Sequence, residues 1–157
     1  MSTRSTGHAT FVIERTFEFA PAVVFAAWAD AEAKSGWFAG PGDWELLHRE
    51  LDFKIGGRER LRGVFPGGHV TEFDSWFHDI IANKRIVYAY DMRLNDIKIS
   101  VSLATIKFEA AGTGTRLIVT EQGVFLDGYA DAGTHEHGTR GLLEKLGAAL
   151  QRAVGGA

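Results

Sequence analysis

Most of the chain alternates apolar and polar residues with a period of two. The alternation runs from Phe11 to Phe19, stops at Pro21, and resumes at Trp44. Because successive side chains of a β-strand point to opposite faces, this pattern predicts half-buried strands. Short segments rich in glycine and asparagine separate them, which favours antiparallel hairpins. The strands expected after Trp44 are Glu45–Phe53, Arg58–Phe65, Val70–Ile81, Arg85–Arg93, Lys98–Ala110 and Thr115–Phe125.

Two regions follow helical spacing instead. Pro21 suits the first position of a short helix, and a second short helix is expected over Ala31–Phe38. A long amphipathic helix should begin between Asp131 and Thr139 and continue close to the C-terminus. Its apolar stripe consists of Leu142, Leu146, Ala149, Leu150 and Val154, widened by Leu143.

This order of elements predicts an α+β fold. A twisted antiparallel sheet has one face to bury, and the C-terminal helix is the available cover. A curved sheet closed by a single helix leaves a space in which a small apolar molecule fits. We expect residues 1–9 to form a flexible tail and residues 10–157 to form a single domain.

Composition excludes several classes of protein. The 157 residues include no cysteine and carry a formal charge of −3 with a pI of about 6.1. Disulfides and thiolate metal sites are therefore excluded, and a nucleic-acid partner is not expected. No apolar run is long enough for a membrane span, and no secretory signal is present, so we expect a cytoplasmic protein. Gly112-Thr-Gly114 lacks the following helix of a phosphate-binding loop, so no nucleotide cofactor, and no other cofactor, is expected.

Four segments resemble one known superfamily. They are Ala20–Phe38, with its Ala-Pro and Trp37-Phe38, then Asp52–Arg58, Gly114–Gly123 and Glu136–Gly138. Together they resemble the START-like (birch-pollen-allergen-like, SRPBCC) superfamily. The similar branch is the one named for the C-terminal domain of the activator of the heat-shock protein 90 ATPase. The resemblance implies a helix-grip fold, with a curved antiparallel sheet of about seven strands enclosing a hydrophobic cavity.

The resemblance does not imply one activity, because a shared fold does not transfer function. The superfamily includes lipid carriers, hormone receptors and polyketide cyclases. Family members usually have a tryptophan directly after the glycine that opens the last helix, whereas Gly138 is followed here by Thr139 and Arg140. We expect a lone domain, without the separate N-terminal domain of the full activator, which makes a chaperone contact a secondary expectation.

Large aromatic and apolar side chains are the candidates for a ligand site, because such side chains line apolar cavities. Plain core packing is the alternative for each of them. Alternation places Tyr88, Tyr90 and Met92 on one face of their strand and leaves open whether that face is concave. The candidate ligand-binding residues are Trp28, Trp37, Phe38, Phe65, Trp76, Tyr88, Tyr90, Leu142 and Leu146.

Three arginines in one strand are polar candidates. Arg58, Arg60 and Arg62 share a face, which would bind an anionic ligand if it were concave. Since arginine is seldom buried unpaired, we favour a solvent-facing row that pairs with acids such as Glu72 and Asp74.

The histidines suggest little chemistry. His135 and His137 point about 200° apart on a helix, so we expect a polar helix start and no metal site. His48, His69 and His78 are scattered over strands and turns, and one of them could act as a general base. No carboxylate is paired with them in the sequence, so exposed or satisfied histidines are the simpler interpretation.

Three functions follow as hypotheses. The first is a non-enzymatic protein that binds a small hydrophobic or aromatic molecule, such as a lipid, in its cavity. The second is a cyclase- or hydrolase-like enzyme acting on a polyketide-like substrate, which requires an ionisable side chain in the cavity. The third is an ATPase-stimulating partner of a chaperone in the stress response. Either a monomer or a homodimer is compatible with the sequence.

Overall fold

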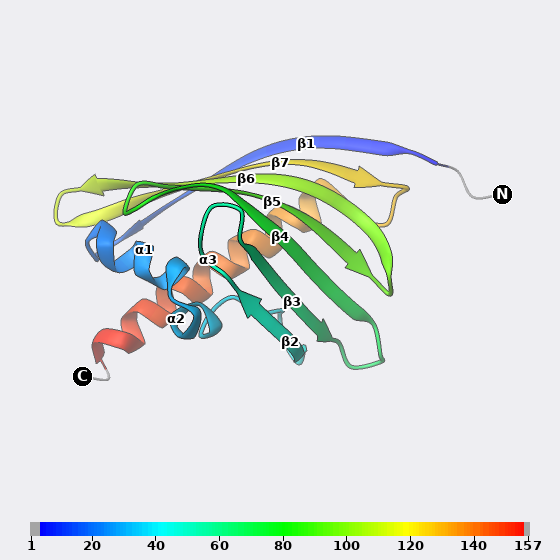
Figure 1. Cartoon of the computed structure of the whole chain (residues 1–157), viewed down its shortest axis with the longest axis horizontal. Helices are drawn as coiled ribbons and strands as arrows, with labels where there is room; N and C mark the ends of the chain where they lie inside the picture. Colours follow the sequence, from blue (N-terminus) through cyan, green and yellow to red (C-terminus); the bar gives the residue numbers. More distant parts are fainter. Residues whose placement is uncertain (1–3, 156–157) are drawn as a thin grey trace.

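The computed structural model of the chain describes residues 4–155, and it has the predicted α+β helix-grip architecture (Figure 1). A curved sheet of seven antiparallel strands is accompanied by three helices. The strands are β1 (Thr6–Phe17), β2 (Glu45–Leu51), β3 (Arg58–Val64), β4 (Val70–Ile81), β5 (Arg85–Leu94), β6 (Ile97–Ala111) and β7 (Gly114–Leu126). The helices are α1 (Pro21–Ala29), α2 (Ala31–Ser35) and α3 (Ala132–Gly155). None of the described helices has the length and apolar character that a membrane span requires.

The strand order is β1-β7-β6-β5-β4-β3-β2, so strands β2 to β7 form the expected meander and β1 adds to its far edge. β1 pairs with β7 from Thr6, opposite Leu126, to Phe17, opposite Thr115. The predicted tail of residues 1–9 was therefore too long, because residues 6–9 gain backbone partners on β7. Residues 1–3 of that tail lie outside the described residues.

The helices begin where the sequence indicated, but α2 is shorter than predicted. It ends at Ser35 instead of Phe38, because the chain turns at Gly36 and the Trp37 indole donates a hydrogen bond to the carbonyl of Ala27 at 3.0 Å. α3 begins at Ala132, and the carboxylate of Asp131 accepts a hydrogen bond from the Thr134 amide at 2.8 Å.

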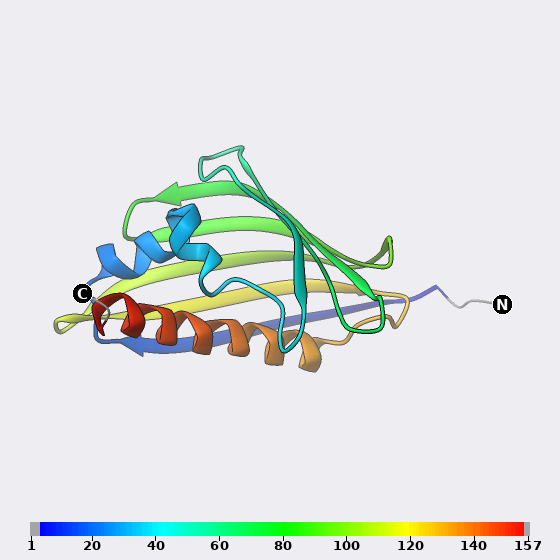
Figure 2. The same cartoon turned by 90° about the horizontal axis from the view of Figure 1, so that it is seen from below.

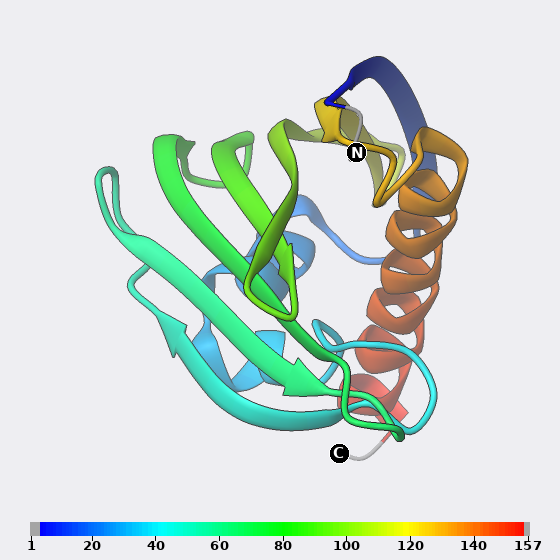
Figure 3. The same cartoon turned by 90° about the vertical axis from the view of Figure 1, so that its right-hand side faces the viewer.

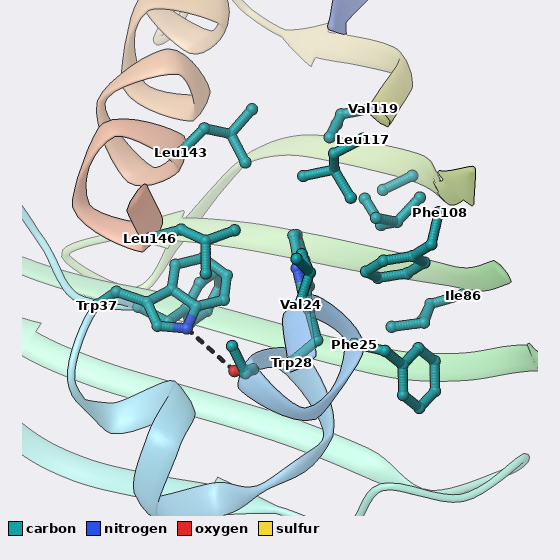
Figure 4. Close-up of a cluster of buried hydrophobic side chains, with 14 of the residues drawn as sticks. Val24, Phe25, Trp28, Trp37, Ile86, Phe108, Leu117, Val119, Leu143 and Leu146 are labelled. Carbon is teal, nitrogen blue, oxygen red and sulfur yellow. Dashed lines mark hydrogen bonds between the residues drawn. The ribbon is translucent and has the colours of Figure 1, made fainter. Parts of the chain in front are cut away.

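The core lies on the concave face of the sheet, at the end covered by α1 and α2. Figure 2 shows these two helices and the C-terminal end of α3 at the same end of the sheet. Figure 4 shows Val24 and Trp28 of α1 among side chains of the sheet and of α3. Val24, Leu117 and Leu146 are each 0% exposed and Trp28 is 3% exposed. This end of the space between sheet and helix is therefore filled.

α3 lies along the open side of the curved sheet (Figure 3). Its C-terminal part carries Leu143, Leu146 and Leu150, which are buried as the predicted stripe requires, whereas the side chain of Val154 lies outside the described residues. Its N-terminal part spans the other end of the sheet, which neither α1 nor α2 covers. The ammonium of Lys145 ties the loop of residues 36–44 to the helix by donating to the carbonyls of Ala39 and Gly40.

Candidate ligand pocket

A pocket of about 410 Å³ lies between the N-terminal part of α3, the loop of residues 36–44 and the concave face of the sheet. Its walls are mainly apolar: Phe38 and Trp44 come from the loop, Phe73 and Met92 from the sheet, and Leu142 from α3. The volume is in the range of pockets that take small organic ligands. The face that carries Tyr90 and Met92 is the concave one, which answers the question that alternation left open.

Trp44 forms one wall because two glycines leave room for its indole. A Cβ on Gly63 would lie 1.9 Å from the ring, and one on Gly40 would lie 2.4 Å from it. The indole N–H donates to the hydroxyl of Thr71 at 2.9 Å, which orients the ring. Trp44 was not among the predicted ligand-binding residues. A glycine inside an alternating strand indicates the close approach of another group, and this signal could have identified it.

A second, smaller chamber of about 40 Å³ lies deeper in the molecule. Trp28 and Trp37 line it from the α1–α2 region, Tyr88 and Glu121 from the sheet, and Leu143 from α3. This inner chamber and the outer pocket share the side chains of Phe38, Tyr90, Thr139 and Leu142. These four side chains, which we call the partition, separate the two spaces.

A hydrogen-bonded network of polar side chains lies at the partition. The hydroxyl of Tyr90 donates to the carboxylate of Glu121, and the hydroxyl of Thr139 donates to the same carboxylate at 2.7 Å. His135 Nε2 lies 2.5 Å from the Tyr90 hydroxyl and 3.3 Å from Glu121 Oε1. Its ring stacks on Tyr90 with an interplanar angle of 14°. The network thus joins β5, β7 and α3 beside the pocket.

Glu121 is only 5% exposed, and the sequence interpretation did not include it in the site. Alternation offered a signal, since Glu121 follows Leu117 and Val119 on the buried face of β7. A carboxylate at such a position needs hydrogen-bond donors, because an unpaired buried charge is costly. Thr139 supplies one of them.

Two tyrosines at the chambers remain protonated over a wide pH range. Burial, followed by the charge of Glu121, raises the pKa of Tyr90 well above its usual value near 10. The pKa of Tyr88 is raised well above that value for the same two reasons, with a smaller effect from Glu59. Both side chains therefore present a hydroxyl, which donates and accepts hydrogen bonds.

Buried serine hydroxyls add polar groups to the concave face. The hydroxyl of Ser100 has no hydrogen-bond partner among the described residues, although the residue is 1% exposed and lines the outer pocket. Ser75, opposite Tyr90 on β4, is 0% exposed and is also unpaired within the described part of the chain.

The structure brings together most, but not all, of the nine predicted ligand-binding residues. Leu146 packs in the core and lines neither space. Trp76 lies on the opposite face of the sheet, where the guanidinium carbon of Arg58 is 4.9 Å from its ring centroid. The other seven line at least one of the two spaces. Phe65 lines only the outer pocket, and Trp28, Trp37 and Tyr88 line only the inner chamber. Phe38, Tyr90 and Leu142 line both.

The three arginines of β3 lie on the outer face of the sheet, as favoured. Arg58 pairs with Asp74 at 2.7 Å, Arg62 pairs with Glu72 at 3.1 Å, and Arg60 is 3.6 Å from Asp74. They therefore do not contribute to the pocket.

The histidines divide into two groups. His135 and His137 line the outer pocket, whereas His48, His69 and His78 are exposed and lie outside both chambers. The open alternative of a general base at one of these three positions gains no support, because the positions lie away from both chambers. Within residues 4–155, no three histidine or acidic side chains are grouped so that they could hold a metal ion.

A buried ion pair supports the wall behind the pocket. The ammonium of Lys34 in α2 lies 2.5 Å from the carboxylate of Glu59 in β3, and these residues are 1% and 2% exposed. The same ammonium lies 4.5 Å from the ring centroid of Phe38 and 5.4 Å from that of Trp28. Burial lowers the pKa of Lys34 and outweighs the attraction of Glu59, which acts in the opposite direction. The pair holds α2, and with it Phe38, against the sheet.

The architecture agrees with a comparison against protein families. The model of the family described as "Activator of Hsp90 ATPase homolog 1-like protein" matches residues 18–151. The chain belongs to this family. The match begins directly after β1 and extends into the last turns of α3, so it includes both chambers.

Solved structures of similar chains include two from rhizobia. An uncharacterized protein from Rhizobium leguminosarum is 47% identical, with a TM-score of 0.91 over 96% of this chain and 99% of that one. A protein from Rhizobium loti is 41% identical, with a TM-score of 0.86 over 92% of this chain and 99% of that one. The AHSA1-like protein from Aeromonas hydrophila, at 19% identity and a TM-score of 0.68 over 92% and 94%, shares the fold. Among curated proteins, none matches the chain.

Proposed function

We propose that this family member binds a small, mainly apolar molecule in the outer pocket. The observation that carries the proposal is the volume of about 410 Å³ enclosed by mainly apolar side chains of the sheet, the loop and α3. Removing the apolar surface of a ligand from water would supply the binding free energy, at roughly 25 cal/mol per Å². The polar groups at the partition would orient the ligand.

A neutral fluorescent probe tests this function. N-phenyl-1-naphthylamine becomes bright in apolar surroundings, and we expect a saturable increase in fluorescence with one site per chain. Gly141 lines the pocket, and a Cβ built on it has no neighbour within 4 Å, so Gly141→Trp should place an indole in the pocket and abolish binding.

Ala148→Trp is the matched control, because it adds the same side chain to an exposed position of α3 outside the pocket. This variant should bind the probe like the wild type. Absence of saturable binding by the wild type, or equal binding by both variants, would refute the proposal.

An enzyme acting by proton transfer is the second candidate, and one observation favours it. Tyr90, Glu121 and His135 form a hydrogen-bonded chain beside the pocket, as general acid–base chemistry on a polyketide-like substrate requires. Exchange of the acidic C–H protons of a 1,3-diketone in D₂O, followed by NMR, tests it. Catalysis should be lost in Glu121→Gln, and exchange no faster than in buffer would exclude this candidate.

The family description refers to an activator of the Hsp90 ATPase. Such a partner contacts a chaperone through its surface, so an internal pocket gives this role no support. It stays a prediction of the resemblance, and stimulation of a purified Hsp90 ATPase by the wild-type protein would establish it.

A further inference from the structure

Two side chains that line the inner chamber, Trp28 and Tyr88, carry polar groups without a side-chain partner among the described residues. Trp28 is 3% exposed, and its indole N–H has no partner among the described residues. Trp37, which lines the same chamber, differs because its indole N–H is satisfied by the carbonyl of Ala27, as the dashed line in Figure 4 marks. The hydroxyl of Tyr88, a residue 6% exposed, makes no side-chain hydrogen bond within residues 4–155. A buried donor left without an acceptor is destabilising, because it has lost its hydrogen bonds to water and gained none.

The charges and lone pairs at the chamber restrict what would satisfy these donors. Trp28 offers only a donor, and the neutral Tyr88 hydroxyl donates as well, so the occupant must carry a lone pair. An ammonium group has none. Glu121 lines the same chamber as a buried carboxylate, and its one basic neighbour within ion-pair distance among the described residues is His135, at 3.3 Å, so a second carboxylate beside it is disfavoured. A neutral oxygen that accepts from Trp28 and Tyr88 and donates to Glu121 meets all three conditions.

The size and position of the chamber fit the end of a longer ligand. Its volume of about 40 Å³ exceeds the roughly 10–15 Å³ that a single water needs, so it has room for a hydroxyl group with its carbon. The outer pocket lies directly across the partition. Leu142 of the partition is only partly buried and lines both spaces.

We propose that the ligand is a neutral alcohol with an apolar body, whose hydroxyl group enters the inner chamber while the body fills the outer pocket. The hydroxyl accepts hydrogen bonds from Trp28 and Tyr88 and donates one to Glu121. This proposal rests on the proposed function, because it requires the outer pocket to hold the apolar body. It adds a selection for the alcohol over the acid and the amine of equal chain length.

Displacement of N-phenyl-1-naphthylamine by octan-1-ol, octanoate and octylamine at pH 7 tests the selection. We expect octan-1-ol to bind about tenfold more tightly than either charged analogue, since the charged ends cannot satisfy the chamber. Tyr88→Phe deletes one donor with little change of volume and should weaken octan-1-ol about three- to tenfold. Tyr129→Phe deletes the same hydroxyl from a residue that is 52% exposed and outside both spaces, and it should behave as the wild type.

The outcomes separate the two proposals. If the probe binds but the three octyl compounds displace it equally, or if the amine or acid binds best, the alcohol proposal is wrong and the pocket remains. The same holds if Tyr88→Phe leaves octan-1-ol binding unchanged, because the chamber then holds water alone. If the wild type binds neither the probe nor any octyl compound, the proposed function fails and this inference fails with it. Should Tyr88→Phe not fold, the comparison of the three compounds on the wild type decides.

Discussion

The buried ion pair between Lys34 and Glu59 leads to a prediction about stability. The two charged atoms are 2.5 Å apart, and the side chains are 2% and 3% exposed. Lys34→Met therefore leaves the carboxylate of Glu59 buried without its ammonium partner. Removal of one member of such a pair typically destabilises by about 3–5 kcal/mol, because the remaining charge is neither solvated nor paired.

The double variant Lys34→Met/Glu59→Met should be far less destabilised than the sum of the single variants. Both charges are gone, and two side chains of similar volume replace them in apolar surroundings formed by Phe38, Phe77 and Trp28. We expect the double variant to be at least about 3 kcal/mol more stable than additivity predicts.

Urea unfolding followed by tryptophan fluorescence measures these differences, since Trp28 lies beside the pair. Arg62→Met is the matched control: it breaks the pair with Glu72 at 3.1 Å, but these side chains are 49% and 30% exposed, so the loss should stay below about 1 kcal/mol. Strictly additive losses in the double variant, or a loss at Lys34 as small as that at Arg62, would refute the reasoning.

Three further results are expected. Gly138→Ala adds a methyl group in open space on α3 and should stabilise the fold by about 0.5–1 kcal/mol in urea unfolding. Gly128 has a φ of +72°, which favours glycine, so Gly128→Ala should destabilise the fold. Equal effects of the two substitutions would contradict this prediction. Because the pKa of Tyr88 is raised in the folded state, the unfolded state loses this proton first, and the free energy of unfolding should fall as the pH rises above 10. Relative to Tyr88→Phe, the free energy of unfolding of the wild type should decrease by up to about 1.4 kcal/mol per pH unit. Parallel curves of stability against pH for the two proteins would argue against a buried neutral Tyr88. Leu142→Ala removes part of the partition, so the preferred chain length of a bound alcohol should increase by about two carbons. In displacement assays, each added CH₂ should strengthen binding by about 0.8 kcal/mol up to the new optimum. An unchanged optimum would show that Leu142 does not limit the space.

Prediction of the fold succeeded where a local pattern carried the information. β4 has the predicted bounds, Val70–Ile81, because alternation and the flanking turns mark both of its ends. Prediction was less accurate where distant partners decide the end of an element. β1 begins at Thr6 because β7 is long enough to pair with it, and α2 ends early because Trp37 bonds to α1.

Prediction of the candidate site was also limited by contacts between residues that are distant in the sequence. Trp76 and Tyr90 both have the size and shape expected of a ligand-binding side chain, but they lie on opposite faces of the sheet. Alternation assigns residues to two faces of each strand, yet only the curvature of the complete sheet makes one face concave. The contact of Glu121 with Tyr90, His135 and Thr139 joins three elements, and no spacing along the chain encodes it.

The order of apolar and polar residues is sufficient to specify the elements of this protein, because strand and helix periodicities are local consequences of backbone geometry. It also specifies that α3 must cover the sheet, since its apolar stripe has no other partner. The hollow at one end, and the unsatisfied donors inside it, arise only when the sheet bends and α1 and α2 fill the opposite end. A cavity is the volume that packing leaves empty, so it depends on all of its walls at once, and those walls come from segments between Trp28 and Lys145.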